Sequence, residues 1–178
     1  LVGNDESAAV LEGTLIGPVL RFEQDSLVAL SGGQADTRID DAPVPHRRAI
    51  FVQAGTEVVV GPCTSGCRTT LAIAGGVDVA PVLGSRSSNV RAHCGGFEGR
   101  ALRVGDRLPI GPLSDASRRL LATLRGNAAR WTAEEPGWEH DLAPPMGGDV
   151  TVRTLPGAAS AALDEQSRHT FFSMPFTV

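Results

Sequence analysis

Lysine and tyrosine are absent from this chain of 178 residues, and cysteine occurs only three times. All 16 positive charges are therefore arginine, which excludes a Schiff-base lysine, a phosphate-binding lysine of the Walker type and a biotinylated lysine. Cys63, Cys67 and Cys94 have the spacing neither of a secreted disulfide framework nor of a zinc site. We predict reduced thiols and no metal site.

The chain also lacks long apolar runs and any concentration of positive charge. No run approaches the roughly 20 residues of a membrane span, and the first residues have neither the basic start nor the apolar stretch of a signal peptide. Opposite charges are interspersed at a net charge of -4, so no basic stripe is present to bind a phosphate backbone. These features predict a soluble, cytoplasmic protein that binds neither membrane nor nucleic acid.

Turn-forming residues are frequent instead. The 21 glycines and 12 prolines are spread along a chain that is 42% hydrophobic, which indicates many turns and a β-rich fold. The length fits a single domain over residues 1–178, with a core mainly of Val, Leu, Ile and Ala because aromatic residues make up only 4%. Short apolar stretches predict strands at residues 15–16, 20–22, 27–30, 37–39, 49–52, 57–60, 68–73 and 150–155. Turns are predicted between them, among others at residues 31–33 and 61–66.

Two helices are predicted near the C-terminal side. Ser114 is a candidate N-cap for a short helix that ends at Arg125 and places Leu120, Leu121 and Leu124 on one face. A second helix is expected over residues 158–173, and residues 127–148 form an irregular segment. Residues 74–108 form a long connection punctuated by glycine, and such loops in compact domains are usually functional.

The most informative stretches lie in this connection and read AGGVDVAPVLGSRSS (residues 74–88) and GGFEGRAL (residues 95–102). Glycine lets the backbone approach a ligand, and the hydroxyl groups beside Arg86 offer directed donors to a carboxylate or phosphate. A purely structural explanation also exists, in which the glycines form turns, Arg86 pairs with Asp78, and Arg100 pairs with Glu98. Spacing alone favours the structural explanation, because glycine-rich loops are common.

Both stretches resemble the signature of the family that contains 5-oxoprolinase component C, urea amidolyase and allophanate hydrolase subunit 2. This chain has Ala80 where that family usually has Pro, and Ser88 where it has Thr. Neither the TTVQDxGRxG-like nor the SDRMGYRL-like segment that flanks the signature in the family is present, and both are expected to line the same cleft. The likeness continues in family order through LVGN (residues 1–4), PVP (43–45), SGCR (65–68) and LPG (155–157).

The resemblance implies a mainly β fold, a cyclophilin-like β-barrel with a few short helices, incomplete at both ends. It implies a subunit of an ATP-dependent amide-processing enzyme, and the first expectation is 5-oxoprolinase, which converts 5-oxoproline, ATP and water to glutamate. ATP would be a co-substrate of the complex, and the expected partners are a sister subunit of the same family and a LamB/YcsF-type subunit.

Two alternative functions stay open. The chain could be the carboxyltransferase component of urea carboxylase or urea amidolyase, with biotin carried on a partner. It could also be a regulatory interaction protein that antagonises a kinase inhibitor, in which case it would use its surface and not a cleft.

The same resemblance marks the expected site residues. Arg86, Glu98 and Arg100 are expected to be catalytic, since arginine clamps stabilise the oxyanions of acyl and carbonyl phosphate chemistry. His93, beside Cys94, is a minor candidate for a general base, because imidazole often has that role near neutral pH. The expected substrate-binding residues are Gly75, Gly76, Asp78, Gly84, Ser85, Ser87, Gly95 and Gly96.

Overall fold

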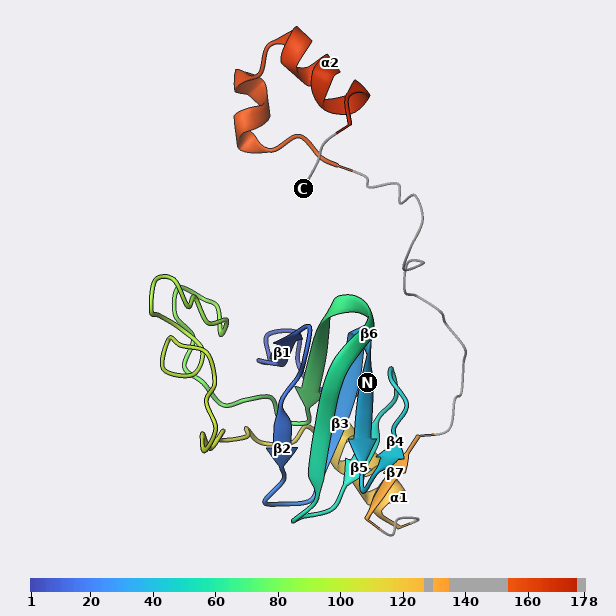
Figure 1. Ribbon diagram of the computed structural model, residues 1–178. Helices are drawn as coiled ribbons and strands as arrows, with labels where there is room; N and C mark the ends of the chain where they lie inside the picture. The colour runs from blue at the N-terminus through green and yellow to red at the C-terminus, as the bar shows by residue number, and fades with distance from the viewer. Residues whose placement is uncertain (127–129, 135–153, 176–178) are drawn as a thin grey trace. The chain divides into compact units, whose positions relative to one another are not determined.

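The computed structural model describes residues 1–126, 130–134 and 154–175 (Figure 1). Two compact units divide the chain, Leu1–Pro144 and Pro145–Val178, and each is described by itself. The single domain expected over residues 1–178 stays a prediction. Within the described ranges, no helix is long and apolar enough to cross a membrane.

The first unit is built on a seven-stranded antiparallel sheet. Its strands follow the order β1-β6-β3-β5-β7, while β2 pairs with β6 and β4 with β3. The mainly β fold is thus confirmed, although the described pairings do not by themselves close the sheet into the expected barrel. The elements are β1 (Leu11–Thr14), β2 (Val19–Arg21), β3 (Ser26–Ile39), β4 (Ala42–Pro43), β5 (Ile50–Val52), β6 (Glu57–Ile73), α1 (Asp115–Arg125) and β7 (Trp131–Ala133).

The two long strands β3 and β6 run side by side through the middle of the sheet (Figure 1). The turns predicted at residues 31–33 and 61–66 are wrong, because these segments continue the ladder through register shifts. A Cβ on Gly32 would lie 2.5 Å from the carbonyl oxygen of Arg68, and one on Gly33 would lie 2.8 Å from that of Ser65. Glycine therefore keeps the strands paired across a bulge that any larger residue would push apart.

Both faces of the first half of β3 are buried, which explains its unbroken apolar run. Val28 and Leu30 belong to one core cluster, and Leu27 and Ala29 belong to another that also contains Leu124 of α1. All four β3 side chains are at most 3% exposed, and each fully buried leucine or valine stabilises the fold by about 1.5–3 kcal/mol. The sheet is thus covered on both sides at this point.

The predicted helix at residues 114–125 is confirmed as α1. The Ser114 side chain accepts a hydrogen bond from the Ser117 N–H, as expected of an N-cap. Leu124 is buried, and Leu120 and Leu121 pack against the same cluster, so the three leucines share the face that covers the sheet. Ser117 is fully buried, and its hydroxyl donates to the carbonyl oxygen of Val2 (2.7 Å), which ties the N-terminal segment to α1.

Of three other local predictions, two are wrong and one falls mostly outside the described residues. The strand at residues 15–16 is wrong, because Leu15 has φ 64° and kinks the chain between β1 and β2. In the second unit, the single helix over residues 158–173 is also wrong. A 3₁₀ helix, Ala158–Ala162, is followed by α2 (Glu165–Ser173), since the Asp164 side chain accepts from the Ser167 N–H and starts a new helix. Most of the strand predicted at residues 150–155 lies outside the described residues.

Candidate functional site

The first part of the glycine-rich connection, Gly75 and Gly76, lies directly after β6 and packs against other backbone. The Gly75 N–H donates to the side-chain oxygen of Asn4 (2.8 Å), and the Asn4 amide donates back to the Ile73 carbonyl oxygen (2.8 Å). A Cβ on Gly75 would lie 2.1 Å from the carbonyl oxygen of Gly111. These contacts show that the glycine pair fits the chain into a narrow space between the N-terminal segment and residue 111.

Past these glycines, the chain leaves the sheet, and residues 81–108 (green to yellow) loop away beside it (Figure 1). Asp78 is exposed, and its backbone N–H donates to the Pro109 carbonyl oxygen (2.8 Å), which holds the two ends of the loop together. The exposed ion pair between Arg107 and Glu23 (3.1 Å) lies at the same end of the loop.

Ser85 and Arg86 lie on a tight hairpin within the loop. Val82 and Ser85 exchange two backbone hydrogen bonds (2.8 and 3.0 Å), and Leu83 and Gly84 between them both have positive φ. The Arg86 guanidinium donates to the Val79 carbonyl oxygen and not to Asp78, so the pair expected in the structural explanation does not form. One N–H of the guanidinium thus fixes the partly buried Arg86 side chain, and its other N–H groups can donate to an anionic or amide oxygen of a ligand.

The second glycine pair brings the two signature stretches together. A Cβ on Gly95 would lie 2.4 Å from the Ser87 carbonyl oxygen, and one on Gly96 would lie 1.8 Å from the Ser88 hydroxyl oxygen. Ser87 is held in addition by its N–H, which donates to the Ser85 hydroxyl (3.1 Å). The structure therefore brings Ser85, Ser87, Gly95 and Gly96 together, whereas Gly75 and Gly76 lie at the base of the loop.

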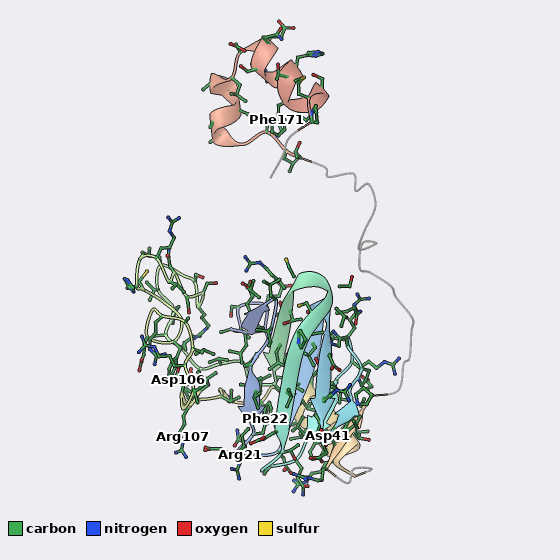
Figure 2. All side chains as sticks on the ribbon, in the orientation of Figure 1. Arg21, Phe22, Asp41, Asp106, Arg107 and Phe171 are labelled. Carbon is green, nitrogen blue, oxygen red and sulfur yellow. The ribbon has the colours of Figure 1, made fainter. Side chains whose placement is uncertain are left out.

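Arg100, one of the expected catalytic residues, pairs with Glu98 and with a third residue, Asp106. Figure 2 labels Asp106 on the projecting loop. Arg100 forms a two-pronged ion pair with Asp106 (2.7 and 2.9 Å), an ion pair with Glu98 (2.6 Å) and a stacking contact over Phe97 (5.3 Å). The Arg100–Glu98 pair of the structural explanation is therefore present, and Arg100 holds together the turns that carry its partners.

The charges of this cluster stabilise one another. Hydrogen bonds from the Arg100 guanidinium, and then from the Arg103 N–H, lower the pKa of Asp106 to about 2. The pKa of Arg100 is raised, chiefly by its hydrogen bond to Asp106. Arg100 and Asp106 have side chains only 22% and 16% exposed, whereas the Glu98 side chain is 62% exposed. Glu98 is thus the member of the cluster that an external molecule can reach.

His93 lies on an exposed turn close to the second glycine pair. It has φ 52°, and Asn89 and Cys94 on either side of the turn exchange backbone hydrogen bonds (2.8 and 3.2 Å). A Cβ on Gly99 would lie 2.4 Å from the carbonyl oxygen of His93, so the turn is packed against the start of the Arg100 cluster. The three cysteines are free, and no group of three or more metal-ligating side chains occurs within the described ranges.

Sequence reasoning missed Asp106 and Asn4. Asp106 occupies a turn six residues after Arg100, and an acidic residue at that distance carries no recognised signal. Asn4 bridges Ile73 and Gly75, at sequence separations of 69 and 71 residues. Long-range partners of this kind cannot be read from local pattern.

A family model for the carboxyltransferase domain, subdomain A and B, matches residues 1–178. The chain belongs to this family. Within it, the chain is 44% identical to 5-oxoprolinase component C of Escherichia coli over 176 residues, which cover 99% of this chain and 50% of that protein. It is 41% identical to urea amidolyase of Lachancea kluyveri over 108 residues, which cover 61% of this chain and 6% of that protein.

Solved carboxyltransferase structures agree with the fold. The chain superimposes on the crystal structure of Kluyveromyces lactis urea amidolyase with a TM-score of 0.60 at 41% identity, covering 61% of this chain and 6% of that one. The structure of K. lactis urea carboxylase gives the same TM-score and identity, with 10% of its chain covered. The chain thus spans half the length of one curated relative and a small part of the larger ones.

Proposed function

We propose that this chain is part of a 5-oxoprolinase subunit, which with companion subunits converts 5-oxoproline, ATP and water to glutamate and ADP with phosphate. The observation that supports this most is the extent of the matches. The likeness to 5-oxoprolinase component C of E. coli covers 99% of the chain, whereas the likeness to urea amidolyase of L. kluyveri covers 61%.

The second candidate is the carboxyltransferase component of a urea carboxylase. It is supported by 41% identity and a TM-score of 0.60 over the part of the chain that matches the K. lactis enzymes. Both reactions act on an amide and develop negative charge on an oxygen that must be stabilised. The two candidates therefore require the same kind of site and differ in the substrate.

Arg86 is proposed as the main ligand of that developing oxyanion. Its backbone is fixed by the hairpin, its side chain by the Val79 carbonyl oxygen, and the hydroxyls of Ser85 and Ser87 flank it. Such a preorganised arrangement costs little reorganisation when charge develops. Gly84, Gly95 and Gly96 would leave room for the substrate beside it, and Gly75, Gly76 and Asp78 would hold the base of the loop.

Glu98 and Arg100 are proposed to act as a pair. Glu98 is the exposed carboxylate that could orient a water or a substrate N–H, and Arg100 keeps it in place while also binding Asp106. Because Arg100 already has carboxylate and carbonyl partners, its proposed part is to position Glu98.

ATP is proposed as a co-substrate of the assembled cytoplasmic enzyme. If the urea reaction applies, biotin must be carried by a partner, because none of the 178 residues is a lysine to which biotin could be attached. A sister subunit of the same family and a LamB/YcsF-type subunit are the proposed companions.

The test is ATP hydrolysis by this protein assembled with its companion subunits, measured after addition of 5-oxoproline and, separately, urea. Arg86→Ala should abolish most of the substrate-dependent turnover, whereas the matched control Arg119→Ala, an exposed arginine on α1, should leave it unchanged. Turnover with urea alone would favour the carboxyltransferase. Turnover that survives Arg86→Ala would exclude the proposed site. Together with lost binding of the partner, it would favour the interaction protein.

A further inference from the structure

Aliphatic side chains are exposed on the projecting loop, residues 81–108, which we call the docking loop. Leu83 and Val104 are fully exposed, at 101% and 108%, and Val82, Val90 and Leu102 are 40–49% exposed. Single exposed aliphatic residues are common on protein surfaces, but five within one loop make this loop a candidate interaction site.

Leu83 is held in a position that does not suit leucine. It is the first of two residues at the tip of the Val82–Ser85 hairpin, with φ 51°, and Gly84 follows at φ 78°. Two-residue turns with positive φ at both positions are normally occupied by asparagine, aspartate or glycine. An exposed leucine gains no burial in return for this strained backbone, so its presence at the tip needs a reason outside the described residues.

Val104 is presented in a similarly fixed way. It lies in a turn closed by the Asp106 N–H, which donates to the Arg103 carbonyl oxygen (3.1 Å), with Gly105 at φ 92°. The Asp106 carboxylate accepts from the Arg103 N–H (2.7 Å) and from the Arg100 guanidinium. The ion-pair cluster thus makes this turn rigid, and Val104 is left exposed to solvent on it.

The docking loop also differs in charge from the remainder of the chain. It contains five arginines against two carboxylates, Glu98 and Asp106, for a formal charge of +3. Since the whole chain carries -4, the residues outside the loop carry -7. Both carboxylates of the loop are paired with Arg100, whereas Arg91 and Arg103 are exposed on the same loop as the aliphatic residues.

We propose that the docking loop binds an acidic surface on a companion subunit, with Leu83 and Val104 inserted into apolar recesses and the arginines facing carboxylates. The choice of a companion subunit as the binding partner rests on the proposed function, in which the chain belongs to a multi-subunit enzyme. It also rests on charge, because the loop is cationic and would be complementary to an acidic surface. Rigid turns carrying aliphatic anchors lose little conformational entropy on binding.

This docking would place the proposed substrate ligands at a subunit boundary. Leu83 lies at the tip of the Val82–Ser85 hairpin and Arg86 follows it directly, while Gly95 and Gly96 pack against Ser87 and Ser88. A partner seated on Leu83 would therefore exclude water beside Arg86, which strengthens the electrostatic interactions of its guanidinium.

The experiment measures binding of the intact protein to the companion 5-oxoprolinase subunits by titration calorimetry. Leu83→Asn suits positive φ and removes the aliphatic anchor, so it should leave the urea unfolding midpoint unchanged or raised. We expect it to raise the dissociation constant at least about tenfold, as is usual for a buried anchor. Val104→Asp should do the same, and binding should weaken with added salt.

The matched control is Val19→Asp, which places a charge on an aliphatic residue of β2 that is 62% exposed and outside the loop. Its dissociation constant should equal that of the wild type. Unchanged binding in both loop variants, or no binding of the companion subunits, would overturn the proposal. A loop-dependent change in the sedimentation of the chain alone would overturn it too, by assigning the loop to a second copy instead. Loop-dependent binding without turnover of 5-oxoproline would leave the docking proposal standing and refute the proposed function.

Discussion

Replacing Gly75 by alanine tests whether the first glycine pair of the signature is needed for packing. Two effects are expected. Gly75 has φ 91°, which an L-residue adopts at a cost of about 1–2 kcal/mol. In addition, the new Cβ would lie 2.1 Å from the Gly111 carbonyl oxygen, far inside van der Waals contact, and this neighbour is backbone that cannot rotate away. Overpacking of this kind costs about 1–3 kcal/mol more.

The chain offers a control that separates the two effects. Gly55 has a similar φ of 83°, but a Cβ there would meet nothing within 4 Å. Gly55→Ala should therefore lower the free energy of unfolding by about 1–2 kcal/mol through backbone strain alone. Gly75→Ala should lower it by about 2–5 kcal/mol, the sum of strain and collision.

Urea unfolding followed by circular dichroism gives both values, provided that the dependence on urea is the same in all variants. Equal losses for Gly75→Ala and Gly55→Ala would refute the packing explanation and return Gly75 to the set of residues kept for a ligand. Gly111→Ala provides a further check, since its Cβ would lie 2.5 Å from the Gly75 carbonyl oxygen. The double variant should lose less than the two single losses added together, because one backbone shift relieves both collisions.

Buried or paired polar groups lead to three further predictions. Burial lowers the pKa of His46, whose Nδ1 is buried and has no hydrogen-bond partner among the described residues. The contribution of His46 to stability is complete above the unfolded pKa of 6.5 and is lost as the pH falls through the folded pKa. The melting temperature should therefore fall more steeply on acidification in the wild type than in His46→Gln. Ser117→Ala removes the hydroxyl that donates to the Val2 carbonyl oxygen. It should lower the free energy of unfolding, measured by urea titration, by about 1–3 kcal/mol. The control Ser167→Ala should cause a negligible loss, because that side chain is exposed. Asp106→Asn weakens the pairing with Arg100, so hydrogen exchange at the Arg103 N–H should accelerate while the exchange of β3 stays unchanged.

The sequence predicted those parts of the structure that depend on local pattern. The mainly β fold follows from short apolar stretches between turn residues, and α1 follows from a serine cap and three leucines at helical spacing. The turns assigned inside β3 and β6 failed because glycine has two uses. In a loop it permits positive φ, and at Gly33 it admits the Ser65 carbonyl oxygen of the neighbouring strand, which only the three-dimensional structure shows.

The sequence predicted only part of the candidate site, because contacts between distant segments leave no local pattern. The contact between the two signature stretches arises where Gly96 packs on Ser88, and the Arg100–Glu98 pair is close in sequence. The Asn4 bridge and the Asp106 ion pair depend on how distant or irregular segments meet, and neither has a periodic signal. The catalytic and substrate-binding assignments of Arg86, Glu98, Ser85 and Ser87 stay predictions.

The long ladder between β3 and β6 has a consequence for the order in which the chain folds. Residue numbers differ by 19 in the Ile39–Val58 pair and by 45 in the Val28–Ile73 pair. Closing the shorter loop costs less chain entropy, so we expect pairing to begin at the Ile39 end and to extend toward Val28. The bulge near Gly33 lies between the two ends, and growth of the ladder must pass it before β1 and β5 find their partners. Pairing of the C-terminal end of β6, which precedes the signature loop, is therefore a late event, and we expect the loop to take shape after this end of the sheet.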